Sequence, residues 1–287
     1  MLCGAGVIAA ALLGAAAPAR AHFERMLLSS RAAALGGAFV AIADDPSATV
    51  ENPAGLCGIR SLSLLSTYQR PYGLDGVDEG YLAAALPVPG VALGASWFHR
   101  GVDGIMNEDV LTVAVGRDLK RTSEDASLSI GASVDLAMVS VAESLDESAR
   151  AASIAAGVLL RPFAFIGVGY AIRNLNAPEF DLVEGGGATT LASTQAVALA
   201  YYWQERLVVT VESRQDGSDE WRARGGFELR VESHLVLRGG LDESRASAGA
   251  GVEWHGVTLD AAMTSHEVLG ASYLFTLRYT RAPEVKP

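Results

Sequence analysis

The chain has 287 residues, half of them apolar, and its formal net charge at pH 7 is −11. This acidity argues against nucleic acid as a partner, because surfaces that bind phosphates carry an excess of lysine and arginine. Its two cysteines and five histidines form no cluster with metal-site spacing, so the sequence predicts neither a metal nor a cofactor.

Residues 1–21 have the features of a secretory signal peptide. An uncharged stretch rich in alanine and glycine precedes the small-residue cleavage site Ala19-Arg20-Ala21. The alternative is an uncleaved membrane anchor, although the stretch is short for the about 20 apolar residues that span a bilayer. Cleavage would remove Cys3 and leave Cys57 as the single thiol.

The next segment, residues 22–58, lacks strand-like alternation and contains residues that favour irregular backbone. Gly36 and Gly37 can adopt positive φ or allow close backbone approach. Pro53 biases the preceding Asn52 toward extended geometry. These features predict a compact, irregular unit rather than a strand.

An acidic turn lies in the middle of that segment. Asp44-Asp45-Pro46 is followed by Ser47 and, further on, by Glu51. Aspartate, proline and serine favour turns, so a solvated turn is the simpler interpretation. Binding of a cation by the carboxylates is the alternative.

Residues 59–281 consist of short runs in which apolar and polar residues alternate, separated by turn signals, and 282–287 form a tail. In residues 221–231, for example, Phe227 lies on the apolar face and Glu228 on the polar face, because successive strand side chains point to opposite sides. The pattern predicts about fourteen strands, at residues 60–69, 79–87, 91–100, 108–118, 127–139, 151–161, 164–174, 191–203, 205–213, 221–231, 233–241, 246–254, 257–265 and 271–280.

Connections between these runs support the count. A transmembrane β-barrel has short turns at one end and longer loops at the other. Every second connection is short, as at residues 87–90 and 255–256, whereas the alternate connections, such as residues 174–190, are longer and hold much of the acid. Residues 118–126 are the exception. This parity favours an even-stranded antiparallel barrel with both chain ends on the short-turn side.

The strands also carry aromatic residues near their ends. Amphipathic rings prefer the headgroup level of a membrane, so together they are candidates for an aromatic girdle. A closed barrel is required in lipid because an open sheet edge would leave backbone groups unpaired. The candidate girdle residues are Tyr68, Tyr81, Trp97, Tyr170, Tyr201, Tyr202, Trp203, Trp221, Trp254, Tyr273 and Tyr279.

Charged residues on the polar faces are candidates for the barrel lumen. They either line a solute path or form ion pairs that rigidify a filled lumen, since ionisable groups at membrane depth need partners. The candidates are Asp135, Arg173, Glu212, Arg222, Arg224, Glu228, Arg230, Arg238, Glu253 and Asp260.

The chain resembles the FadL-like superfamily of outer-membrane barrels, and within it most closely the PorV/PorQ family. The resemblance rests on residues 31–56, RAAALGGAFVAIADDPSATVENPAGL, on residues 167–178, GVGYAIRNLNAP, and on the ending 256–280, with Asp260, His266, Leu269 and Gly270 at recurring positions. It implies a transmembrane barrel whose N-terminal hatch contains Gly36, Gly37, Asp44, Asp45, Asn52, Pro53 and Ala54.

The resemblance further implies residence in a Gram-negative outer membrane, in contact with its lipids, and transport of small hydrophobic molecules such as fatty acids or hydrocarbons. The alternatives are a PorV-like barrel that handles protein cargo for a secretion system, and a structural outer-membrane protein. No common catalytic motif is present. The pair Ser265-His266 lacks the third group that would orient a catalytic base, so we predict that the protein is not an enzyme.

Overall fold

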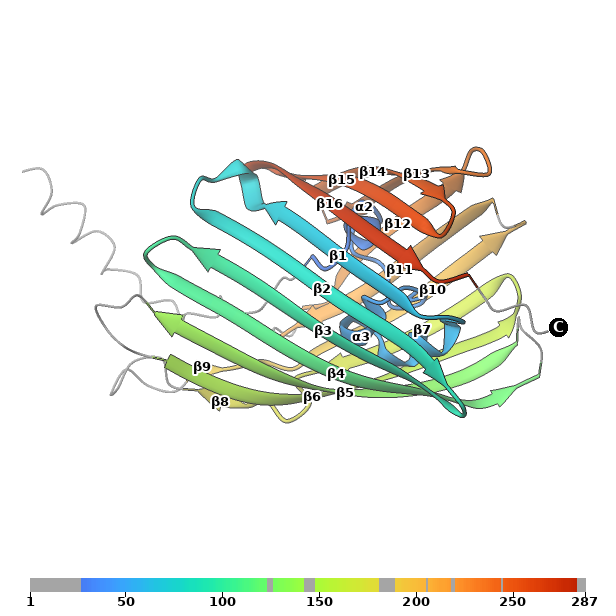
Figure 1. Cartoon of the computed structure of the whole chain (residues 1–287), viewed down its shortest axis with the longest axis horizontal. Coiled ribbons are helices and arrows are strands. Elements are labelled where there is room, and N and C mark those ends of the chain that lie inside the picture. The colour runs from blue at the N-terminus through green and yellow to red at the C-terminus, as the bar shows by residue number, and fades with distance from the viewer. Residues whose placement is uncertain are drawn as a thin grey trace, which may run out of the picture.

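The computed structural model describes residues 27–122, 126–141, 148–180, 189–204, 206–217, 220–243 and 245–282. The predicted signal peptide, the first residues of the predicted hatch (22–26) and most of the tail lie outside these ranges. Fourteen antiparallel strands form a closed barrel (Figure 1), which confirms the predicted strand number and the all-β class.

The strand boundaries agree with the predicted ones to within a few residues. A two-stranded hairpin, β8 (Glu179–Phe180) with β9 (Thr189–Thr190), lies in the connection between β7 and β10 and stays outside the barrel ladder. The barrel strands are β1 (Ser63–Arg70), β2 (Val77–Val88), β3 (Val91–Val102), β4 (Met106–Arg121), β5 (Ser127–Val141), β6 (Ser148–Phe163), β7 (Ile166–Arg173), β10 (Thr194–Trp203), β11 (Leu207–Asp216), β12 (Arg222–Arg230), β13 (Leu235–Asp242), β14 (Arg245–Trp254), β15 (Val257–His266) and β16 (Gly270–Thr280).

Each strand pairs with its neighbours in the chain, and β1 closes the barrel against β16 with Thr67 opposite Thr276. Closure matters because it removes the exposed strand edges that would otherwise pair with other chains. The apparent exception at residues 118–126 is partly strand: β4 continues to Arg121, past a register shift between Asp118 and Lys120, and pairs there with β5.

The connections distinguish the two ends of the barrel. At one end, which we call the short-turn end, β2–β3, β6–β7 and β14–β15 are joined by two residues each, at 89–90, 164–165 and 255–256. Gly90 and Gly256 adopt positive φ there (88° and 80°), which glycine tolerates without strain. The opposite, long-loop end carries residues 174–193. Connections 103–105, 243–244 and 267–269 at that end are also short, so the predicted asymmetry holds for only some of the connections.

The outward face is apolar, and the inward face holds mostly small and polar side chains, with a few large apolar ones such as Tyr81 and Phe98. Phe227 is 45% exposed, whereas the side chain of the next residue, Glu228, is 12% exposed and points inward. This is the alternation that the sequence predicts for β12. Other large apolar side chains on the outward face include Leu82, Leu111, Val113, Val134, Ile154, Leu199, Val211, Leu259, Phe275 and Leu277.

Several aromatic residues lie on the outward face with their polar tips bonded to polar neighbours. Trp97 Nε1–H donates to Asp109 Oδ1 at 2.8 Å, and the Tyr170 hydroxyl donates to Gln195 Oε1 at 3.0 Å. Two members of the predicted girdle are wrong, however. Tyr81, 2% exposed, points into the lumen in a cluster of apolar residues, and Tyr202 packs inward against the core. Their alternation within the strand, rather than closeness to its end, decides the side they face.

The N-terminal segment lies inside the barrel (Figure 1), in short helical pieces: α2 (Ser30–Ala34), α3 (Ala48–Glu51) and the 3₁₀ helix η1 (Pro53–Gly58). A second 3₁₀ turn, η2 (Pro71–Gly73), lies in the β1–β2 connection. Within the part of the chain that the structure describes, no helix has the length and apolar character needed to cross a membrane.

Candidate functional site

Residues 27–59, which we call the plug, fill the barrel lumen. None of these residues is exposed, and nearly all are buried. Helix α2 contacts β13 to β16, while η1 contacts β2 to β6 on the other side of the barrel. The segment therefore reaches from one wall to the other, and its packing decides whether anything can pass.

The first half of the plug approaches the wall backbone to backbone. Gly36 has φ of 68°, and a Cβ there would lie 2.5 Å from the carbonyl oxygen of Leu241. The wall also carries glycine at the contact: Gly226 and Gly240 lie opposite each other on β12 and β13. A Cβ on Gly226 would lie 2.7 Å from Leu35 Cα. Side chains at these positions would push the plug away from the wall.

A row of glycines receives the second half of the plug. Gly116, Gly131 and Gly157 are direct register partners across β4, β5 and β6. A Cβ on Gly116 would lie 2.7 Å from the carbonyl oxygen of Pro53, and a Cβ on Gly131 would collide with the backbone of Pro53 and Ala54. These strands stay fully paired, so the glycines make room for the plug and do not mark a break in the wall.

Asn52 ties the two halves of the plug to each other and to the wall. Its Nδ2 donates to the carbonyl oxygens of Val40 (2.9 Å) and Val158 (3.2 Å), and its Oδ1 accepts from the Ala54 amide (3.2 Å). Its extended backbone, with φ of −160°, is the geometry that Pro53 favours. One buried amide thus satisfies backbone groups from three segments.

The acidic segment forms a turn as predicted, but the turn is buried inside the barrel, so the predicted solvation is wrong. Asp45 Oδ1 accepts from the Ser47 amide (2.9 Å) and hydroxyl (2.6 Å), and burial raises its pKa. Asp44 instead pairs with Arg31 at 2.5 Å. Among the described residues, no three His, Cys, Asp or Glu side chains lie close enough together to hold a metal ion.

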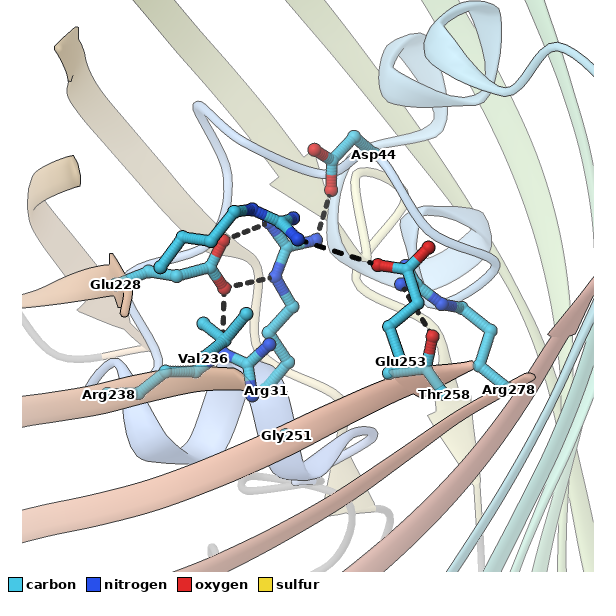
Figure 2. Close-up of a pocket in the computed structure, with 10 residues that line it drawn as sticks. Arg31, Asp44, Glu228, Val236, Arg238, Gly251, Glu253, Thr258 and Arg278 are labelled. Carbon is cyan, nitrogen blue, oxygen red and sulfur yellow. Dashed lines mark hydrogen bonds and ion pairs between the residues drawn. The ribbon is translucent and has the colours of Figure 1, made fainter. Parts of the chain in front are cut away.

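A buried ion-pair network joins the plug to the C-terminal strands (Figure 2). Arg31 binds Glu228 with two contacts, Nε to Oε2 at 2.7 Å and Nη2 to Oε1 at 3.1 Å. Arg238 Nε donates to Glu228 Oε2 (2.6 Å), and its Nη1 donates to Asp260 (2.6 Å). Charges that are this deeply buried depend on one another, because removing one leaves its partner uncompensated.

A second contact holds the middle of the plug. Glu212 Oε2 accepts from the backbone amides of Phe39 (3.0 Å) and Val40 (3.2 Å). Its other oxygen binds the guanidinium of Arg224. The wall carboxylate therefore satisfies two plug amides while an arginine balances its charge.

The remaining predicted lumen residues also point inward, with different partners. Asp135 accepts from Thr112 (2.7 Å) within the wall. Arg222 and Arg230 lie half-exposed near opposite barrel ends, 3.4 Å from Glu243 and 3.8 Å from Glu253. Most of the set is paired, which favours the ion-pair interpretation over an open solute path. Sequence reasoning missed Arg31, although it is the only charged residue in the run RAAALGG.

Ser265 links β15 to β14, and His266 supports the turn after β15. The Ser265 hydroxyl donates to the Ala246 carbonyl (3.0 Å) and accepts from its amide (3.1 Å). His266 Nδ1 accepts from the amides of Val268 and Leu269, both at 3.2 Å. Each side chain thus bonds to backbone.

A groove of about 1250 Å³ lies on the outward side of β10 to β13. Gly225 and Gly239 face outward there, and the ring of Phe227 lies over Gly239, where a Cβ would be 2.8 Å from it. Their inward neighbours Gly226 and Gly240 touch the plug, so only backbone separates the plug from the groove. The apolar side chains around it are Val168, Val197, Leu199, Val209, Val211, Phe227 and Leu241.

No protein-family model matches the chain, and no curated protein does. Solved structures share its fold. The monoaromatic hydrocarbon channel CymD has 11% identity and a TM-score of 0.65 over 89% of this chain and 97% of that chain. The toluene transporter TbuX of Ralstonia pickettii has 11% identity and a TM-score of 0.64 over 89% and 98%. A FadL homologue of Pseudomonas aeruginosa has 13% identity and a TM-score of 0.60 over 88% and 98%. The fold is therefore that of FadL-like barrels.

Proposed function

We propose that the protein is an outer-membrane channel that carries small hydrophobic molecules past its plug. The observation that carries this proposal is a closed fourteen-stranded barrel, apolar outside, whose lumen is filled by its own N-terminal segment. The solved structures with this fold include channels for toluene and other monoaromatic hydrocarbons.

The barrel surface suits a bilayer. Each strand pairs with a neighbour on both sides in a closed ladder, which lipid requires because it offers no hydrogen bonds. Outward side chains are apolar, and Trp97 and Tyr170 hold their polar tips against polar neighbours, as rings at a membrane interface do. Export after removal of residues 1–21 would deliver the chain to this membrane.

The interior supports apolar rather than polar cargo. On the long-loop side of the plug, inward residues of β1 to β6 form an apolar cluster around Tyr81, Phe98 and Val110. Beyond it, residues 22–58 act as the hatch, which must shift before cargo can cross. The outward groove then offers an apolar surface directly behind the glycines Gly226 and Gly240.

Uptake of a hydrocarbon tests the proposal. A Gram-negative host without hydrocarbon channels of its own should take up radiolabelled toluene faster when it makes this protein. Ala223→Trp, which fills the groove from β12, should reduce the gain severalfold, whereas Ala261→Trp, also outward but outside the groove, should keep it. Equal uptake with and without the protein, for toluene and for a fatty acid, would argue against transport.

The PorV/PorQ likeness of residues 31–56 supports a second candidate, handling of protein cargo for a secretion system. The filled lumen and the short connections 243–244 and 267–269 are compatible with a barrel that presents a surface instead of a pore. This candidate predicts loss of a secreted protein, with unchanged toluene uptake, when the protein is removed from its own host.

A further inference from the structure

A polar cavity of about 160 Å³ lies between the plug and the C-terminal strands, toward the short-turn end (Figure 2). Its deep side is formed by Arg31, Arg238 and Glu228. Arg278, Arg230 and Thr258 line the rest of it, together with the carboxylates of Glu253 and Asp44.

On the deep side of the cavity, each charged side chain is already paired with an opposite charge. Glu228 accepts from both Arg31 and Arg238, whose remaining donors reach Asp44 and Asp260 at 2.5 and 2.6 Å. These side chains have little capacity left for another charged group. The cavity's capacity to bind therefore lies with the other arginines.

Arg278, on β16, has unused donors. Its Nη2 donates to Thr258 Oγ1 at 3.2 Å, while its Nε is buried and lacks a hydrogen-bond partner within the described part of the chain. Its charge acts on the plug carboxylate of Asp45, but that carboxylate is hydrogen-bonded to Ser47. A buried guanidinium nitrogen without an acceptor is a strong attractor for an oxyanion.

Arg230 and Glu253 lie at the mouth of the cavity, close to solvent. Their closest atoms are 3.8 Å apart, beyond hydrogen-bond distance, and both side chains are nearly half-exposed. Such a pair is weak because water screens it. Glu253 can turn into solvent at little cost, and Arg230 then keeps one contact, from Nη1 to the Ser233 carbonyl oxygen at 3.3 Å, and has other donors for the cavity.

We propose that this cavity binds a small oxyanion, a carboxylate or a phosphate, between Arg278 and Arg230. Guanidinium groups match both anions through paired N–H donors of fixed geometry. The source is either a free anion from the adjacent aqueous compartment or the carboxylate of an otherwise apolar molecule. The site goes beyond the proposed transport function and can exist without it.

Calorimetric titration of the purified mature barrel in a non-ionic detergent tests the site. The probes are inorganic phosphate, octanoate and, as an uncharged control, octanol. We expect saturable binding of at least one anion and none of octanol. Binding of octanoate alone identifies an apolar carboxylate as the source, whereas binding of phosphate identifies a free anion.

The same titration measures the anion affinity of the variants. Arg278→Gln keeps a donor for Thr258 and should weaken anion binding by about tenfold or more, since a charge-assisted contact is lost. Glu253→Gln removes the competing carboxylate and should tighten binding. Arg222→Gln, at the other barrel end, should change nothing. Arg230→Gln replaces Arg278→Gln if the latter does not fold.

Three outcomes would overturn the proposal. One is the absence of saturable binding for both anions. Another is an equal loss of affinity in Arg222→Gln and Arg278→Gln, which would indicate a general charge effect. The last is weaker binding in Glu253→Gln, because the proposal requires this side chain to compete with the anion. Toluene uptake is measured separately, so failure here leaves the transport proposal standing.

Discussion

Replacing Arg31 by alanine should release the plug, because this side chain holds the plug's first half to the wall. It is 10% exposed and makes two contacts with Glu228, which is itself 12% exposed. Removing one partner of a buried pair costs about 3–5 kcal/mol, and the lower figure applies here because Glu228 keeps its contact with Arg238. Its contact with Asp44 adds little, since that carboxylate is 33% exposed and regains water.

The lower figure, about 3 kcal/mol, corresponds to about a hundredfold change in the equilibrium between docked and released plug. Cys57 reports this equilibrium. It is 8% exposed, and burial, followed by the nearby charge of Asp118, raises the pKa of its thiol to about 11. A docked plug therefore keeps the thiol both covered and protonated at pH 8.

Release exposes the thiol and lowers its pKa toward the value near 8.5 of a free cysteine. Labelling of Cys57 by a soluble maleimide at pH 8 should accordingly become about a hundredfold faster in Arg31→Ala. Arg222→Ala, which breaks the half-exposed pair with Glu243, is the matched control and should label at the parent rate. Equal rates in the two variants would show that the plug does not leave as one unit.

Phe227→Arg should impair barrel assembly more than Glu228→Arg, because an outward arginine at the membrane midplane costs about 2–4 kcal/mol. Equal folded yields in lipid vesicles would reject the assigned faces. Deleting residues 24–52 should leave a folded barrel with raised conductance in planar bilayers. A deletion variant that folds and conducts no more than the parent would mean that the segment does not seal the lumen. Gly131→Leu should displace the plug and raise conductance, since even a Cβ there meets plug backbone. Ala132→Leu, its outward neighbour, should behave as the parent, and a leak of the same size in both would contradict this explanation.

The sequence was sufficient for the strand number and the faces of the strands. Alternation is a local property: in β12 it separates Phe227 from Glu228 whatever the rest of the chain does. Turn chemistry at residues 89–90 and 255–256 is equally local. The two wrong girdle assignments, Tyr81 and Tyr202, were made from closeness to strand ends, whereas alternation would have placed both side chains inward.

Pairing inside the lumen could not be predicted in the same way. Arg31 and Glu228 are separated by 197 positions, and nothing local indicates that they meet. The row of Gly116, Gly131 and Gly157 likewise has meaning only once the register sets the three side by side beneath Pro53. In the sequence, each is an isolated glycine that weakens a strand.

The sequence by itself thus determined that this chain forms a barrel with an apolar outside, because periodicity and turns are written residue by residue. Only the tertiary structure decided that the plug fills the barrel and which charged side chains hold the plug in place. Closure of the sheet brings together side chains from distant strands at a fixed depth. Which of them then face each other across the lumen depends on the register and curvature of all fourteen strands.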